Sequence, residues 1–82
     1  MTHFELVMPK MGESIIEATI LRWTKNIGDL IEIDDTLVEI ATDKVDTDVP
    51  SPVKGKLIDI LFNDNDVVPV GQTIAIIATE MD

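Results

Sequence analysis

Apolar and polar residues alternate in short stretches along the whole chain, and turn residues separate these stretches at regular intervals. Alternation with a period of two, together with many β-branched side chains, predicts β-strands rather than helices. Turn signals about every eight to twelve residues are typical of an all-β sandwich or barrel. The predicted strands are residues 4–8, 17–23, 30–33, 37–41, 45–49, 54–62, 67–70 and 73–79.

The chain contains an internal repeat with an offset of 37 residues. This offset places TLVEIAT, which begins at Thr36, on TIAIIAT, which begins at Thr73. It also pairs Asn26 with Asn63, so that turns and strands follow in the same order in each half. Two similar halves of four strands each are expected to bury one common core. We therefore predict a flattened barrel or sandwich of two four-stranded antiparallel sheets with approximate two-fold symmetry.

The stretch from Glu39 to Val49 predicts a hairpin whose tip carries Lys44, the only cation between Asp34 and Val49. The tip sequence TDKV contains neither glycine nor asparagine. Primed hairpin turns need a positive φ at their centre, so a type I turn with both central side chains in solvent is expected here. An exposed amine is suited to acylation by another enzyme, whereas a catalytic lysine is usually desolvated.

The repeat also predicts where Lys44 lies relative to the ends of the chain. Under the offset of 37 residues, Asp43 and Lys44 fall on Glu80 and Met81. One half therefore closes a hairpin where the other half ends, and the two places should lie at opposite ends of the domain. Lys44 is then expected to project away from both termini, as suits a domain that is tethered at one end and presents a group at the other.

Composition argues against several classes of function. Sixteen acidic and six basic residues give a formal net charge of −10 at pH 7, which opposes binding to nucleic acid or to an anionic membrane surface. The chain has no cysteine for a disulfide or a dithiol, and His3 has no partner at metal-ligand spacing. No nucleophile has a base beside it, so the domain itself is not expected to be an enzyme. The start of the chain shows no targeting segment, which predicts a cytoplasmic protein or a processed protein of the mitochondrial matrix.

Three motifs resemble those of one known family. EIATDKV at residues 39–45 resembles the attachment motif of lipoyl domains, whose centre is Thr-Asp-Lys followed by Ala or Val. MPKMGES at residues 8–14 resembles their N-terminal Met-Pro-x-hydrophobic-Gly-Glu stretch, and Trp23 followed by Gly28 and Asp29 matches their Trp-x4-Gly-Asp pattern. The chain is therefore similar to the lipoyl domain of the acyltransferase component, E2, of 2-oxo acid dehydrogenase complexes. Residues 1–82 are expected to form one such domain in the N-terminal part of a longer E2 chain.

The resemblance implies that Lys44 carries lipoic acid in amide linkage, attached by a lipoate ligase or lipoyl transferase. The lipoyl group would visit the thiamin diphosphate-dependent dehydrogenase E1, the acyltransferase core of E2, and the flavoprotein dihydrolipoamide dehydrogenase E3. The isolated domain would be a monomeric carrier, and the complete E2 chain would be the acyltransferase. The residues expected to contribute to recognition by the modifying enzyme or by E1 are Asp43, Val45, Met11, Gly12, Glu13 and Ser14.

The sequence leaves alternatives to the lipoyl carrier open. A biotin carrier domain shares the fold and the hairpin lysine, but its motif has methionine on both sides of the lysine, where this chain has Asp43 and Val45. A β-sandwich interaction module without modification would need no special role for Lys44. A glycine-cleavage H protein also carries lipoate, but it is longer and has helical segments that this pattern lacks. The motifs do not distinguish pyruvate, 2-oxoglutarate and branched-chain 2-oxo acids.

Overall fold

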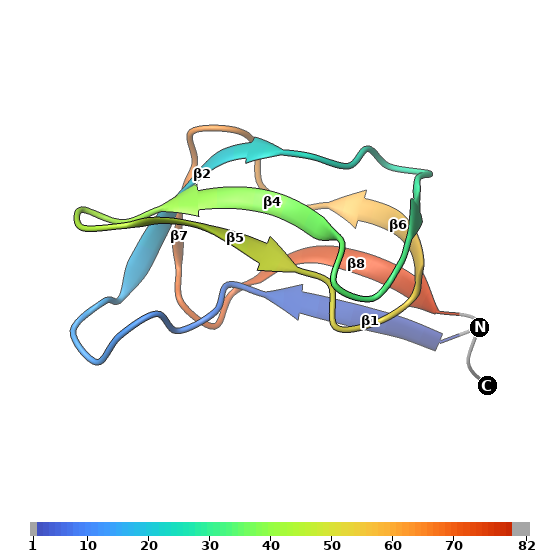
Figure 1. Cartoon of the computed structure of the whole chain (residues 1–82), viewed down its shortest axis with the longest axis horizontal. Coiled ribbons are helices and arrows are strands. Elements are labelled where there is room, and N and C mark those ends of the chain that lie inside the picture. Colours follow the sequence, from blue (N-terminus) through green and yellow to red (C-terminus); the bar gives the residue numbers. More distant parts are fainter. Residues whose placement is uncertain (1, 80–82) are drawn as a thin grey trace.

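The computed structural model describes residues 2–79, which form eight strands joined by turns (Figure 1). The strands are β1 (Thr2–Val7), β2 (Glu17–Trp23), β3 (Leu30–Ile31), β4 (Thr36–Ala41), β5 (Asp46–Pro50), β6 (Gly55–Ile60), β7 (Val67–Pro69) and β8 (Thr73–Thr79). All eight predicted strands are present, and β2 and β8 have the predicted bounds. Residues 2–79 contain no helix, and hence none that is long and apolar enough to cross a membrane.

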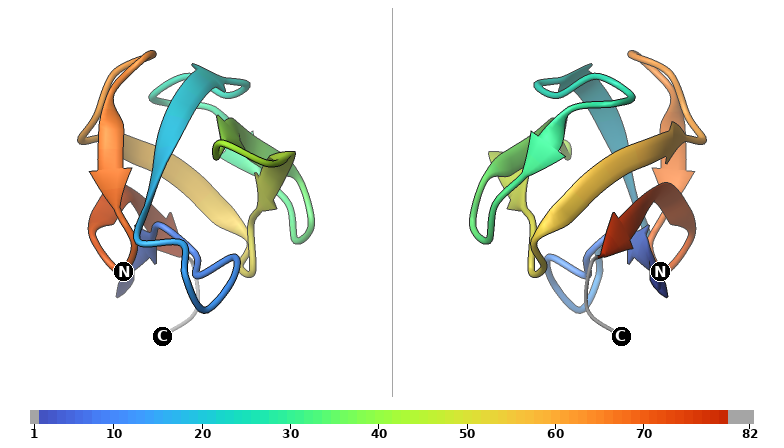
Figure 2. Two further views of the ribbon diagram at one scale, coloured as in Figure 1. Left: turned by 90° about the vertical axis from the view of Figure 1, so that its left-hand side faces the viewer. Right: turned by 90° about the vertical axis from the view of Figure 1, so that its right-hand side faces the viewer.

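The strands form two four-stranded sheets in which every pairing is antiparallel. One sheet has the order β1-β8-β6-β3 and the other has the order β5-β4-β2-β7. The two end-on views in Figure 2 show the strands curving around a common centre. The domain measures 37 × 21 × 19 Å along its principal axes. These features confirm the predicted flattened barrel of two four-stranded sheets.

The offset of 37 residues relates the two sheets. It moves β2, β3 and β4 onto β6, β7 and β8, so the order β4-β2-β7 of one sheet corresponds to β8-β6-β3 of the other. The turns obey the same relation: φ is positive at Gly28 and Asn65, and again at Asp34 and Gly71. Each of these pairs is separated by 37 residues, so the predicted two-fold symmetry extends to the backbone of the turns.

The core lies between the sheets and is also symmetric. Positions that the repeat makes equivalent are buried in both halves. The fully buried equivalent pairs are Ile20 and Leu57, Ile31 and Val68, Leu37 and Ile74, Val38 and Ala75, and Ile40 and Ile77. Since β4 contributes three of these residues, the hairpin that carries Lys44 is anchored in the core at its base.

Strand β3 is shorter than predicted. The pattern predicts one strand over residues 30–33, but the strand in the structure covers only Leu30–Ile31. Ile31 is buried as expected, whereas Ile33 is 61% exposed. A turn starts earlier than the apolar pattern indicates, because the Glu32 N–H donates to Asp35 Oδ2 at 2.9 Å and the Asp35 N–H donates to Glu32 O at 3.1 Å.

Strands β5 and β6 also differ from prediction at their ends. Strand β6 runs over Gly55–Ile60 rather than over residues 54–62, and β5 begins at Asp46 rather than one residue earlier. Asp46 and Asp48 face solvent, as expected for the polar side of an alternating strand. On the opposite face of β5, only Val49 is buried. Strand β5 is an edge strand, and most of its length extends beyond the core.

Candidate functional site

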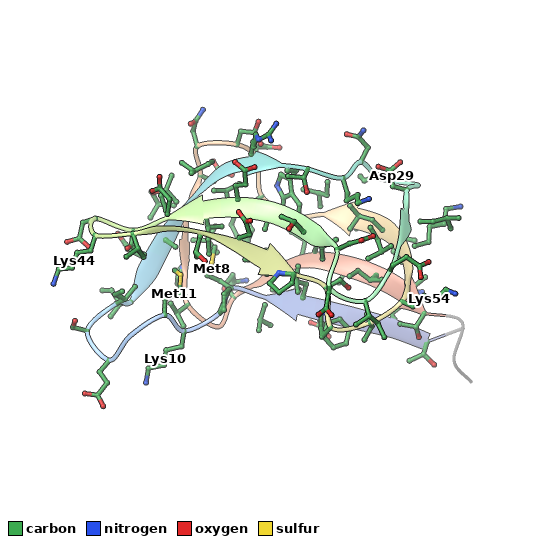
Figure 3. The ribbon with its side chains drawn as sticks, viewed as in Figure 1. Met8, Lys10, Met11, Asp29, Lys44 and Lys54 are labelled. Carbon is green, nitrogen blue, oxygen red and sulfur yellow. The ribbon has the colours of Figure 1, made fainter. Side chains whose placement is uncertain are left out.

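Lys44 lies at the tip of the β4–β5 hairpin and projects from one end of the domain (Figure 3). Thr2 and Thr79, at the outer ends of β1 and β8, pair with each other. Figure 1 shows these ends of β1 and β8 at the opposite end of the long axis from the hairpin tip. The separation of the tip from the described ends of the chain is therefore confirmed. Glu80 and Met81, on which the repeat places the tip, lie outside the described residues.

The hydroxyl group of Thr42 organises the backbone of the tip. Thr42 Oγ1 accepts hydrogen bonds from the backbone N–H of Lys44 at 3.3 Å and of Val45 at 3.2 Å. The Thr42 N–H donates to Val45 O at 2.8 Å, which closes the hairpin. Neither Asp43 nor Lys44 has a positive φ, so the primed turns are excluded as predicted. Because Thr42 fixes the turn without glycine, the backbone of Lys44 has a defined place while its side chain extends into solvent.

Thr42→Val is expected to loosen the tip, because valine has a similar shape but lacks the hydroxyl. Losing one hydrogen bond of about 1 kcal/mol should make the amide protons of Lys44 and Val45 exchange about five times faster. Hydrogen exchange followed by NMR measures this rate for each residue. Thr42→Ser, which keeps the hydroxyl, is the matched control and should retain slow exchange. Equal rates in the wild type and in Thr42→Val would contradict the role of the hydroxyl.

Lys44 forms no ion pair with any described residue, although acidic residues surround it in the sequence. The cross-strand pair Arg22–Glu39, at 3.0 Å, joins β2 to β4. Its hydrogen bond raises the pKa of Arg22 and lowers the pKa of Glu39 from their ordinary values. The other ion pairs of the described residues are Lys25–Asp35 at 3.7 Å and Lys54–Glu32 at 3.9 Å. The amine of Lys44 is thus available to a reaction partner.

A groove of about 650 Å³ opens beside Lys44. One wall is residues 41–44 at the end of the hairpin, and the other is residues 14–19, where the loop after β1 enters β2. Val67 of β7 completes the lining. The side chains of Ile16 and Val67 are 75% and 53% exposed, so the groove presents apolar surface to solvent next to the amine.

Half of the predicted recognition residues lie at this site. Asp43 and Ser14 line the groove, and Val45 is 49% exposed at the tip. The remaining three do not line the groove: Met11, whose side chain packs against the core, Gly12 and Glu13. The loop after β1 therefore reaches the tip through its last residues rather than its first.

Sequence reasoning did not identify Val67 as a site residue, and it included Ile16 only as the end of the loop after β1 that the resemblance assigns to recognition. Val67 begins β7 and belongs to the alternating pattern of the predicted strand 67–70. The exposure of Ile16 and Val67 depends on how the start of β2 is placed relative to β4, which is a contact between strands that are distant in sequence. The one available signal was the adjacent pair Ile15 and Ile16, which breaks the alternation immediately before β2.

The arrangement fits covalent attachment of a carboxylic acid through the amine of Lys44. The amine is exposed, unpaired among the described residues, and held on a defined turn at the end of the domain. The same residues include no group of three or more His, Asp or Glu side chains that could hold a metal ion. The chemistry that residues 2–79 offer at this end of the domain is therefore that of an acceptor amine beside an apolar groove.

Comparison with known proteins agrees with this geometry. The family profile Biotin_lipoyl, described as "Biotin-requiring enzyme", matches residues 4–77. The dihydrolipoyllysine-residue acetyltransferase component of the pyruvate dehydrogenase complex of Corynebacterium glutamicum is 50% identical over 74 residues, which are 90% of this chain and 11% of that protein. The dihydrolipoyllysine-residue succinyltransferase component of the 2-oxoglutarate dehydrogenase complex of Bartonella vinsonii is 48% identical over 66 residues, 80% of this chain and 16% of that protein. The chain thus spans less than a fifth of the length of these relatives.

A solved structure has the same fold. The lipoyl domain of the 2-oxoglutarate dehydrogenase complex from Azotobacter vinelandii superimposes with a TM-score of 0.75 and 30% sequence identity. The match covers 90% of this chain and 94% of that domain. The similarity therefore extends over most of the domain.

Proposed function

The chain belongs to the Biotin_lipoyl family, and from this premise we propose that it is a lipoyl carrier domain with Lys44 as the attachment residue. Its relatives include lipoyl-bearing E2 acyltransferases, which supports the lipoyl carrier over the biotin carrier and over an unmodified interaction module. The observation that carries the assignment of Lys44 is its exposed, unpaired amine at the tip of the hairpin, at the far end from Thr2 and Thr79.

The residues of this chain would hold the group and present it. Lys44 Nζ would form an amide with the carboxyl group of lipoic acid, which removes the positive charge of the lysine. When bound, the lipoyl group supplies a cyclic disulfide that accepts an acyl group and two electrons and passes each to a different site. Thr42 fixes the turn, and the buried residues of β4 anchor it, so the attachment point has a defined position relative to the domain. The acidic residues Asp43 and Asp46 would then flank an uncharged arm.

We propose that the partners are those of a 2-oxo acid dehydrogenase complex. The group on Lys44 would be acylated at E1, would deliver its acyl group to coenzyme A at the E2 core, and would be reoxidised at E3. A lipoate ligase or lipoyl transferase would attach it. The relatives include both acetyltransferase and succinyltransferase components. We therefore propose that the arm carries an acyl group derived from a 2-oxo acid, without choosing one 2-oxo acid. A tether between domain and core raises the effective concentration of the arm at each site.

We also propose that residues 1–82 are one carrier domain at the N-terminal part of a longer acyltransferase chain. The small share of the relatives that the chain covers supports the part of this proposal that concerns a longer chain. The domain on its own would be a monomer. A bacterial cytoplasmic location is supported by the bacterial relatives, and the mitochondrial matrix is the alternative that a yeast relative illustrates.

Incubation of the domain with a lipoate ligase, ATP and lipoic acid is expected to add one lipoyl group, although the chain has five lysines. Intact mass gives the number of groups, and peptide mapping should place the single group on Lys44. Incubation with a biotin ligase and biotin is the control and should add nothing. Attachment to another lysine would contradict the assignment of Lys44, and the absence of any lipoyl increment would contradict the carrier function.

A further inference from the structure

The two halves of the repeat differ next to the hairpin that carries Lys44. In the half without Lys44, the pairing of β6 with β8 runs from Ile60↔Ala75 to Lys56↔Ala78. It then continues with one more pair, Gly55↔Thr79. In the half with Lys44, the pairing of β2 with β4 ends at Thr19↔Ala41, which is the equivalent of Lys56↔Ala78. The pair that would correspond to Gly55↔Thr79 is absent from the pairing of β2 with β4. The sheet therefore opens beside Lys44, while the equivalent place at the other end is closed.

One methyl group accounts for this difference. A Cβ on Gly55 would lie 2.1 Å from the carbonyl O of Ala78, which is too close for any real contact. The repeat places Ala18 on Gly55, and Ala18 has that Cβ. The start of β2 therefore cannot approach β4 as closely as β6 approaches β8. On its other side Ala18 pairs with Val68 of β7, just as Gly55 pairs with Ile31 of β3. The Val70 N–H also donates to Ile16 O at 2.9 Å, which holds the start of β2 on β7.

The groove occupies the space that this opening creates, and its lining combines polar and apolar surface. Ile16 and Val67 leave apolar side chains open to solvent, Ala18 is only 2% exposed, and Glu17 and Asp43 add acidic groups to the lining. Removing apolar surface from water is favourable. An uncharged acyl chain attached to Lys44 starts beside the groove and can cover the exposed side chains of Ile16 and Val67.

We propose that this groove is a resting site for the lipoyl arm of the same domain, with the hydrocarbon chain and the dithiolane ring against Ile16 and Val67. The inference rests on the proposed carrier function, because its occupant is the group that Lys44 would carry. Lys44 is itself part of the lining, so the arm is held at a high effective concentration. The groove stays open on one side, so the arm covers only part of its surface there and can leave for a partner site.

NMR of the isotopically labelled domain before and after lipoylation tests this resting site. We expect chemical-shift changes at Ile16, Ala18 and Val67, and NOEs between the dithiolane protons and the methyl groups of Ile16 and Val67. Intact mass of the same sample reports the lipoyl increment, so the carrier function and the resting site are judged separately. A lipoyl increment with shift changes confined to residues 42–46 would overturn the resting site and leave the carrier function standing. Failure to gain the increment would overturn both.

Variants of the groove give a second measurement. In lipoylated Ile16→Ser and Val67→Ser, a water-soluble phosphine should reduce the disulfide roughly twofold to fivefold faster than in the wild type, because less of the arm is docked. Both side chains are exposed, so the fold should be retained. Leu30→Ser is the matched control, because the repeat places Leu30 on Val67 and its side chain is 73% exposed at the other end of the domain. Its reduction rate should equal that of the wild type. Equal rates in all four proteins would overturn the resting site.

Discussion

Lys44→Arg is expected to abolish lipoylation of the domain and to leave its fold unchanged. An arginine guanidinium stays protonated, so it offers no nucleophilic amine for amide formation. The side chain of Lys44 is exposed and forms no ion pair with a described residue, so the free energy of unfolding should change by less than about 0.5 kcal/mol. Intact mass after incubation with a lipoate ligase measures the first effect, and thermal unfolding measures the second.

The other exposed lysines provide the controls for this experiment. Lys10→Arg and Lys56→Arg carry the same substitution at exposed lysines that also form no ion pair with a described residue. Lys10 lies in the loop after β1 and Lys56 within β6, and neither is at a hairpin tip. Both variants should gain one lipoyl group as the wild type does. A lipoyl increment on Lys44→Arg, or its loss in either control, would show that the hairpin tip does not define the attachment site.

The repeat made much of the fold predictable. Turn and strand residues recur at an offset of 37 residues, and the structure repeats its positive φ angles and its buried positions at the same offset. The hairpin tip was also predictable, because the absence of glycine and asparagine around Lys44 excluded the primed turns. These features depend on residues that are close in sequence or related by one offset, so a single chain is enough to read them.

The groove could not be predicted in the same way. Its existence depends on how closely two strands approach each other, and alternation of apolar residues reports the face of a strand rather than its distance from a neighbour. Ile33 shows the same limit, since its exposure follows from a turn that Asp35 closes with its side chain. Met11 was assigned to recognition with the rest of its loop, but its side chain packs against the core. The equivalence of Ala18 and Gly55 was visible in the sequence, yet its consequence needed the distance to the carbonyl O of Ala78.

Gly55→Ala is expected to be the most destabilising conservative substitution in the chain. The new Cβ would lie 2.1 Å from Ala78 O and 3.0 Å from Ile77 Cγ2, and the first of these contacts is with backbone. Relief requires β6 and β8 to separate at the centre of their sheet, where Ile77 and Leu57 are fully buried. Overpacking of this kind costs about 3 kcal/mol. In a domain of 82 residues, that loss lowers the melting temperature by roughly 10–20 °C.

Ala18→Gly is the matched variant for this prediction, because the repeat makes positions 18 and 55 equivalent. Removing the methyl group of Ala18 creates no clash, so the loss of stability should be about 1 kcal/mol, from the greater freedom of the unfolded chain and the lost apolar contact. Urea unfolding monitored by the fluorescence of Trp23 measures both variants, since this single tryptophan is partly buried and donates from Nε1 to Phe62 O at 3.0 Å. Equal losses at positions 18 and 55 would contradict the close approach of β6 and β8. The asymmetry that we expect is the same one that leaves the groove open beside Lys44 and closed at the other end of the domain.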